Sequence, residues 1–221
     1  MKWIYLVAGG LLFVKMLLLS DPAPGGTEVA IAEAIVADSG VPNAVSGIIF
    51  RNRLYDTLFE VVVFSLAILG AKYLLADETP SAPFYRFTDE PSIVLARLGA
   101  TIAALVGIEL AIRGHLSPGG GFAAGVAGGT AIGLIAITAA SPEWMQAIYQ
   151  RWRAATWEKV SVLIFIGLTV LTLIGIELPA GQFGTLLSGG MIPLLNVLVA
   201  LKVALGSWAV ILLFIRYRGL L

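Results

Sequence analysis

Residues 97–134 read RLGATIAALVGIELAIRGHLSPGGGFAAGVAGGTAIGL and contain two long apolar runs on either side of a short turn. The turn holds the single histidine of the chain, His115, followed closely by a serine, a proline and three glycines. Each flanking run approaches the roughly 20 apolar residues that a helix needs to cross a bilayer. The stretch therefore predicts two membrane-spanning helices joined by a tight, glycine-rich turn.

The composition of the whole chain indicates a membrane protein. Of the 221 residues, 58% are hydrophobic and only 13% are charged, and the mean hydropathy is +0.93, whereas soluble domains carry about 25% charged residues. The net charge is zero, which gives no indication of nucleic-acid binding. The absence of cysteine excludes disulfides, thiolate metal sites and cysteine nucleophiles, and a single histidine excludes a histidine-rich metal site. We expect this chain to hold no metal and no cofactor.

Six apolar windows are long enough to span a bilayer. The first resembles a signal peptide in length, but Lys15 interrupts its apolar core and the DPAPGG stretch after it is a poor cleavage site, which favours a retained helix. We expect an all-α integral membrane protein with about six transmembrane helices, at residues 3–19, 57–75, 92–113, 119–140, 159–177 and 193–217.

The distribution of lysine and arginine predicts the orientation of these spans, because cytoplasmic loops are enriched in both residues. With six spans, both termini lie on the same side of the membrane. That side carries Lys2, Lys72, Arg86, Arg97, Arg151, Arg153, Lys159, Arg216 and Arg218, and the other side carries Arg51, Arg53 and Arg113. We therefore expect both termini in the cytoplasm and the glycine-rich turn on the outer side.

The chain divides into two parts of different character. Residues 1–76 hold two predicted spans, residues 77–91 form a polar, proline-containing cytoplasmic linker, and residues 92–221 hold the other four spans. The outer segment 27–49 is semi-apolar and predicts one or two short interfacial helices, broken around Gly40, Pro42 and Asn43. We expect the two-helix part to dock apart from the four-helix part.

The glycine-rich turn does not fit a phosphate-binding loop. Such a loop follows a strand and ends in a lysine with a serine or threonine, whereas Phe122 and two alanines follow here. Ser117 instead suits a helix N-cap and Pro118 the first helical position. Glycines then recur every four residues and predict close helix packing, a structural role that needs no direct function. These are Gly121, Gly125, Gly129 and Gly133.

Charged residues inside the predicted spans are the strongest functional signal, because charge in hydrocarbon is costly and usually marks an ion path or a partner. Lys202 lies near the middle of its span, and we expect it to pair with a carboxylate. Glu109 and Arg113 are four residues apart and should pair with each other. For the charged candidates other than Lys202, the alternative interpretation is that a long side chain near a span end reaches the interface, without a role in transport. The candidates inside spans are Lys15, Glu60, Glu109 and Lys202, with Glu177 at a span end.

His115 and the pair Asp56–Glu60 have two interpretations each. His115 is either a hydrogen-bonded cap or a group that exchanges protons near neutral pH. Asp56 and Glu60 share one helix face; Asp56 can stay charged beside Arg53, while Glu60 lies one turn deeper, where lost solvation favours its protonated form. This staggered arrangement predicts a proton relay from outer water. In the alternative, Asp56 caps the helix and Glu60 binds its first amides.

The stretch quoted at the start closely resembles the MnhB family, the B-type subunits of the Mrp sodium/proton antiporters, which carry a G-H-x-x-P-G-G-G-F turn between two membrane helices. MIPLLNVLVALKVALG (191–206) resembles a second signature of that family, and the resemblance covers about residues 80–221. IIFRNRLYDTLFEVVVFSLAILG (48–70) resembles the small two-helix E subunit of the membrane-bound hydrogenase, which corresponds to the C-terminal part of the large A-type Mrp protein. Phe59 stands where that family usually has glycine.

The resemblance implies a fusion of these two units that serves as an accessory component of a multisubunit cation/proton antiporter module. The implied partners are large antiporter subunits, small C-, F- and G-type subunits, Na+ and H+, and a hydrogenase or ferredoxin-linked redox arm in some complexes. The implied location is a prokaryotic plasma membrane, and the chain would not be catalytic alone. Two alternatives stay open: a structural, non-conducting subunit, and a self-sufficient oligomeric ion channel.

Overall fold

The structure is a computed structural model that describes residues 14, 27–80, 86–139 and 141–218. The chain forms two compact units, Met1–Ala34 and Ile35–Leu221. In the first unit the described helix is the N-terminal part of α2 (Thr27–Ser39). The second unit holds the other named elements, and every regular element among the described residues is a helix. The all-α fold class predicted from the composition is confirmed.

After α2, the described residues of the second unit form five long helices and three short helical segments. The long helices are α4 (Leu54–Leu74), α5 (Glu90–Arg113), α6 (Gly121–Ala136), α8 (Ala154–Leu173) and α9 (Ile192–Arg218), and the short segments are α3 (Ala44–Gly47), a π-helix (Ile48–Asn52) and α7 (Pro142–Arg151). Among the described residues, α4, α5, α8 and α9 are long and apolar enough to cross a membrane, and α6 is a shorter apolar helix. These five helices overlap the predicted spans after the first, although α8 is shifted toward the N-terminus relative to the predicted span 159–177. The predicted span 3–19 lies outside the described residues.

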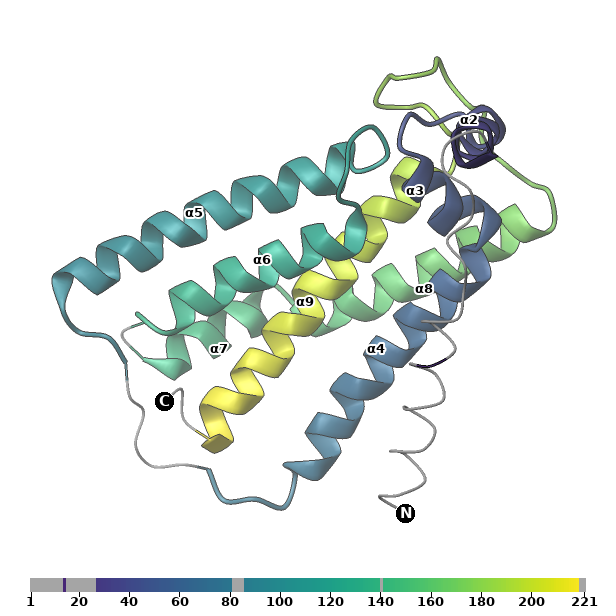
Figure 1. The fold of residues 1–221 in the computed structure, drawn as a ribbon. Coiled ribbons are helices and arrows are strands. Elements are labelled where there is room, and N and C mark those ends of the chain that lie inside the picture. Colours follow the sequence, from purple (N-terminus) through teal and green to yellow (C-terminus); the bar gives the residue numbers. More distant parts are fainter. Residues whose placement is uncertain (1–13, 15–26, 81–85, 140, 219–221) are drawn as a thin grey trace. The chain divides into compact units, whose positions relative to one another are not determined.

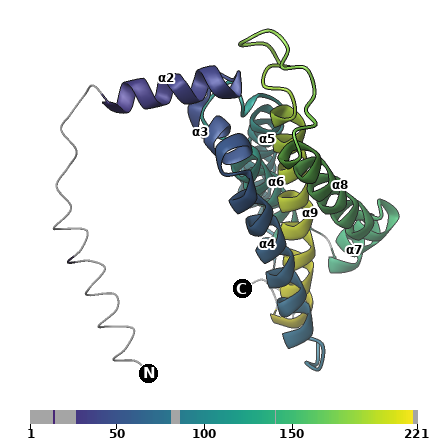
Figure 2. The same ribbon diagram turned by 90° about the vertical axis from the view of Figure 1, so that its right-hand side faces the viewer.

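Helix α9 is the centre of this unit. It packs against α6 and α5 on one side and against α8 and α4 on the other, an arrangement that Figures 1 and 2 show from two directions. The largest core cluster joins Leu54 and Val61 of the α4 segment to Phe165 of α8 and to Leu195 and Val199 of α9. The expectation that the N-terminal part docks apart from the C-terminal helices is therefore wrong for α4, because its apolar face is buried against them.

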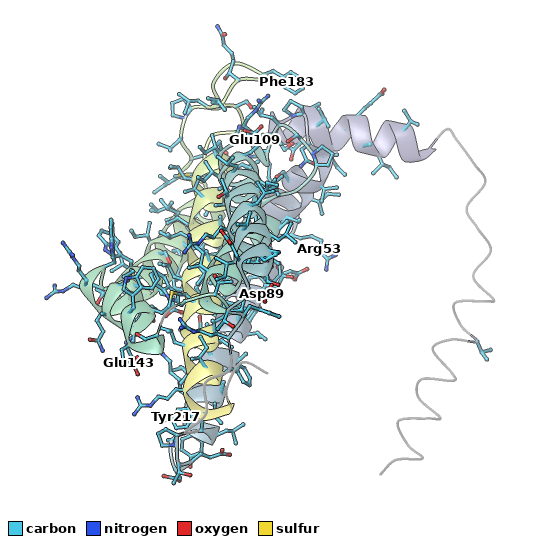
Figure 3. All side chains as sticks on the ribbon, turned by 90° about the vertical axis from the view of Figure 1, so that its left-hand side faces the viewer. Arg53, Asp89, Glu109, Glu143, Phe183 and Tyr217 are labelled. Carbon is cyan, nitrogen blue, oxygen red and sulfur yellow. The ribbon has the colours of Figure 1, made fainter. Side chains whose placement is uncertain are left out.

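The loops and short helices that connect the long helices lie at two opposite ends of the bundle. Figure 3 shows Glu109 and Phe183 toward one end, and Glu143 and Tyr217 toward the other. At the first end α2 stops at Ser39, Gly40 adopts a φ of +68° and α3 begins after Asn43, so the predicted break in this segment is confirmed. Glycine at position 40 meets the need for a left-handed residue after a helix end.

Helix α7 lies at the other end and was not predicted. Its N-cap, Ser141, accepts a hydrogen bond from the Trp144 amide, and Pro142 occupies the first turn. Met145 is buried in a second apolar cluster with Ala136 and Ile215. These contacts fold α7 back against the ends of α8 and α9.

Candidate functional site

The end of α5 is capped by a side chain from α9. The last carbonyl groups of a helix have no partner within the helix, and here Asn196 Nδ2 donates to the carbonyl oxygens of Leu110 at 3.0 Å and Ala111 at 2.7 Å. Asn196 is completely buried. A Cβ at Gly114 would lie 2.8 Å from that nitrogen and 2.6 Å from the Leu110 oxygen. Glycine at 114 therefore makes room for the asparagine that closes the helix.

The turn after α5 is held from the opposite side by the N-cap of α3. Asn43 Nδ2 donates to the carbonyl oxygens of Gly114 at 2.7 Å and Ser117 at 2.8 Å, and the Asn43 amide donates to the His115 oxygen at 3.2 Å. Ser46 Oγ adds a bond of 3.1 Å to the Gly114 oxygen. Buried backbone carbonyls need a hydrogen-bond partner. In this turn the carbonyl oxygens of Gly114, His115 and Ser117 are satisfied by Asn43 and Ser46.

Helix α6 starts later than Ser117 allows. Its N-cap is Gly120, with a φ of 108° and no side-chain cap, and Gly119 has a φ of +142°. Residues with side chains rarely adopt these values. The expectation that Ser117 caps α6 is wrong, because the two glycines extend the turn and Ser117 Oγ instead donates to the Arg113 oxygen at 3.3 Å.

The recurring glycines of α6 lie against α9. A Cβ at Gly121 would collide with the Asn196 backbone oxygen, and one at Gly125 would lie 2.8 Å from the Ala200 oxygen. At Gly129 the nearest atom is Ser207 Cβ, at 2.7 Å, whereas at Gly133 it is Ile211 Cδ1, at 3.7 Å. The backbones of α6 and α9 therefore approach most closely at the end near the turn and diverge toward Gly133.

His115 is completely enclosed at this end of the bundle. Its Nε2 lies 3.4 Å from the Thr185 oxygen, and its Nδ1 has no hydrogen-bond partner within the described part of the chain. Burial lowers the pKa of His115 below its ordinary value, and hydrogen bonds with the backbone of Thr185 and Leu186 oppose that change. Burial therefore favours the neutral form of His115, while the segment after α8 supplies the backbone hydrogen bonds that oppose this shift.

The deepest charged side chains form an ion pair. Lys202 of α9 is 1% exposed and Glu158 of α8 is 7% exposed, and Lys202 Nζ contacts Glu158 Oε1 directly. The same Nζ lies 5.2 Å from the ring centroid of Phe64, on α4, a distance at which a cation is attracted to an aromatic face. The pair is thus enclosed by three helices that are long and apolar enough to cross a membrane.

Glu158 is the site residue that the sequence reasoning missed. The predicted span began at residue 159, whereas α8 begins at Ala154 and takes Glu158 into the helix. A signal was present, because Glu158, Ser161, Phe165 and Thr169 recur at helical spacing and are all buried on one face of α8. A polar residue at the start of such a stripe is a candidate partner for a buried lysine.

Asp56 and Glu60 are both exposed on α4, and neither pairs with Lys202. Arg53 Nε donates to Asp56 Oδ2 at 2.6 Å, as expected from their spacing. The N-cap position of α4 is Arg53 and carries no side-chain cap bond, so the capping interpretation of Asp56 has no support here. Glu60 is exposed, and no hydrogen bond or ion pair of its side chain occurs among the residues that the structure describes.

The remaining charged candidates lie at the end of the bundle that holds the turn. Glu109 and Arg113 are both exposed and pair at 3.3 Å. Glu177 binds Arg51 at 2.9 Å, and Arg51 also binds Asp38 at 3.0 Å. The structure therefore brings none of these to Lys202. Lys15 lies outside the described residues.

Two solved structures resemble this fold. A chain of the membrane-bound sulfane sulfur reductase, an archaeal respiratory membrane complex, aligns with a TM-score of 0.71 and 24% identity over 97% of this chain and 96% of that chain. A chain of the Mrp complex from Dietzia sp. aligns with a TM-score of 0.67 and 20% identity over 96% of this chain but only 26% of that chain. At these identities the likeness shows a common fold.

The sequence has a curated relative and a matching family. An uncharacterised protein of Methanocaldococcus jannaschii is 28% identical in an alignment of 144 positions, which covers 56% of this chain and 53% of the relative, so the match spans about half of that protein. The family described as "Domain related to MnhB subunit of Na+/H+ antiporter" matches residues 91–209. That range covers more than half of the chain and contains the glycine-rich turn, Glu158 and Lys202. The chain is a multi-pass membrane protein that belongs to the family of domains related to the MnhB subunit of Na+/H+ antiporters.

Proposed function

We propose that this protein is an accessory membrane subunit of a multisubunit antiporter module that exchanges Na+ for H+ across a prokaryotic plasma membrane. Membership of the MnhB-related family and the folds shared with chains of the Mrp and sulfane sulfur reductase complexes support this proposal. Its partners are large antiporter subunits and small C-, F- and G-type subunits, with a hydrogenase or other redox arm in related assemblies. Residues 1–76 serve as the unit that resembles the hydrogenase E subunit, joined through 77–91 to the MnhB-related part.

The buried pair of Lys202 and Glu158 is the observation that carries the functional part of the proposal. A charged side chain in the membrane interior is expensive and marks ion paths or their control points. Replacing a buried ion pair by apolar residues is often neutral or stabilising. Stability alone therefore gives little reason to keep Lys202 and Glu158, and we assign the pair to charge movement.

The other candidate residues are proposed to line the approach to this centre or the contacts with partner subunits. Asp56 and Glu60 lie on the exposed part of α4, where a neighbouring subunit would face them. His115 belongs to the enclosed end of the bundle. The full set proposed for the ion and proton path is Glu60, Asp56, Glu109, Lys202, Glu158, His115 and Lys15.

The test is cation-driven proton exchange in vesicles that contain the whole complex. Removing one partner leaves an uncompensated buried charge and costs about 3–5 kcal/mol, so Glu158→Gln or Lys202→Met alone is expected to reduce assembly. The double variant Glu158→Leu with Lys202→Met removes both charges together. It is expected to assemble with normal yield and to lose exchange.

Gly167→Ala is the matched control on α8, because no atom lies within 4 Å of the added Cβ. It should assemble and exchange like the wild type. If the protein is instead a structural, non-conducting subunit, the double variant should keep wild-type exchange. Normal assembly together with wild-type exchange in that variant would establish the structural role and refute our assignment of the pair.

A further inference from the structure

The Lys202 ammonium is a buried charge that depends on few partners. An ammonium group offers three N–H donors, but among the residues that the structure describes Lys202 Nζ donates only to Glu158 Oε1. Opening this bond without a replacement would leave a buried charge uncompensated, which is strongly unfavourable. If Glu158 is to exchange its partner, another group must stabilise the ammonium in the meantime.

The ring of Phe64 is a second partner of this ammonium. Lys202 Nζ lies over the ring, 5.2 Å from its centroid, and the face of an aromatic ring carries a negative potential that attracts a cation within about 6 Å. The attraction is stronger at a site removed from water, and Phe64 packs against the largest core cluster of the bundle. Phe64 therefore stabilises the ammonium without contributing a charge of its own.

The ring of Phe64 is held in place by contacts that do not involve Glu158. Gly206 lies four residues after Lys202, on the same face of α9, and a Cβ at Gly206 would lie 2.7 Å from Phe64 Cε1. The missing side chain at Gly206 thus leaves the space that the ring occupies. On α6 the ring of Phe122 lies 6.2 Å from that of Phe64 between centroids, at an interplanar angle of 78°. The position of the Phe64 ring is therefore set by packing between α4, α6 and α9 and not by the ion pair.

We propose that Phe64 is a positioning residue that holds the Lys202 ammonium in the bundle when its bond to Glu158 opens. The Glu158 carboxylate can then bind a transported proton or Na+ without leaving the lysine charge uncompensated in the apolar interior. The ammonium keeps all its protons, and only its hydrogen bond to Glu158 opens and closes. The role in exchange rests on the proposed function, whereas the contact between ring and ammonium does not.

The experiment replaces Phe64 in the whole complex with phenylalanines that carry one, two or three ring fluorines, introduced at this site alone. Fluorine withdraws electrons from the ring and weakens its attraction for a cation in steps, while the ring keeps nearly the same shape. Cation-driven exchange is expected to fall stepwise, to about 30-fold below the wild type when the attraction of a desolvated site is lost.

The matched control is the same fluorinated series at Phe165. This ring is buried in the same core cluster and makes no cation contact in the described part of the chain. The Phe165 series should exchange like the wild type, because fluorine there changes only the ring and no contact with a charge.

A second readout does not depend on transport. Unfolding of the complex by denaturing detergent is compared for the Phe64 series in the wild type and in the double variant Glu158→Leu with Lys202→Met, which lacks the ammonium. The unfolding midpoint is expected to fall stepwise with the number of fluorines in the wild type and to stay constant in the double variant, because the two effects are coupled only through the ammonium.

Each outcome decides a separate part of the inference. A constant midpoint for the Phe64 series in the wild type, or an equal fall in the double variant or in the Phe165 series, overturns the inference whatever the transport result. A stepwise fall with an unchanged exchange rate overturns the role of Phe64 in exchange. A stepwise fall together with wild-type exchange in the double variant refutes the proposed function but leaves the contact between Phe64 and Lys202 established.

Discussion

Replacing Gly125 with alanine is expected to disrupt the contact between α6 and α9, whereas the same replacement at Gly133 leaves it intact. A Cβ at Gly125 would lie 2.8 Å from the Ala200 backbone oxygen and would also collide with Val203, while at Gly133 the nearest atom is 3.7 Å away. Both changes gain the same helix propensity, about 1 kcal/mol. The difference between the variants therefore isolates the overpacking term, about 1–3 kcal/mol.

That difference corresponds to about 5- to 150-fold in the ratio of folded to unfolded protein. It can be measured by titrating the purified complex with denaturing detergent and following the fluorescence of the tryptophans, of which the chain has five. Gly133→Ala should unfold at the wild-type midpoint or above it, and Gly125→Ala should unfold clearly below Gly133→Ala. Equal midpoints for the two variants would refute the reasoning, since they would mean that α6 does not depend on close approach at Gly125.

Two further predictions concern the turn that closes α5. Asn43→Ala removes the N-cap of α3 and both side-chain bonds to the turn, so it should destabilise the turn by about 1–3 kcal/mol. A cysteine that replaces Ser117 should then be labelled faster than in the parent protein. An unchanged labelling rate would contradict this prediction. Burial lowers the pKa of His115 below 6.5, so a form in which the histidine is exposed takes up a proton at higher pH than the folded form. The stability of the folded form is therefore complete above about pH 6.5 and falls as the pH drops below that value. The thermal midpoint should therefore fall between about pH 7 and pH 5 in the wild type, and His115→Gln should flatten that change; parallel curves would count against it.

The sequence was sufficient for the positions of the long helices because the bilayer imposes a minimum apolar length. The predicted spans 92–113 and 193–217 differ from α5 and α9 by at most two residues at each end. The signature around His115 identified the family because two separated motifs occur in the right order. Both features depend only on local composition and on the spacing of residues along the chain, which can be read directly from one sequence.

The features that the sequence reasoning missed depend on contacts between distant segments. Helix α7 has only 10 residues, and apolar residues such as Met145 on one face are diluted by polar residues on the other. A search for long apolar runs does not detect such a helix. The need of Lys202 for a carboxylate could be stated in advance, but its partner lies 44 residues away in the sequence. Only the packing of α8 on α9 selects Glu158.

The contact between Phe64 and Lys202 also limits how the chain can be divided. The family match begins at residue 91, and α4 ends at Leu74, so the connection between them looks like a natural place to cut. Cutting there and discarding the N-terminal part would remove the aromatic face beside the ammonium group and the α4 side chains that complete the core around α9. The lysine would then face lipid or detergent across the gap. The family match begins at residue 91, but the surroundings of Lys202 include Phe64 of α4, so the buried pair needs residues from outside the matched segment.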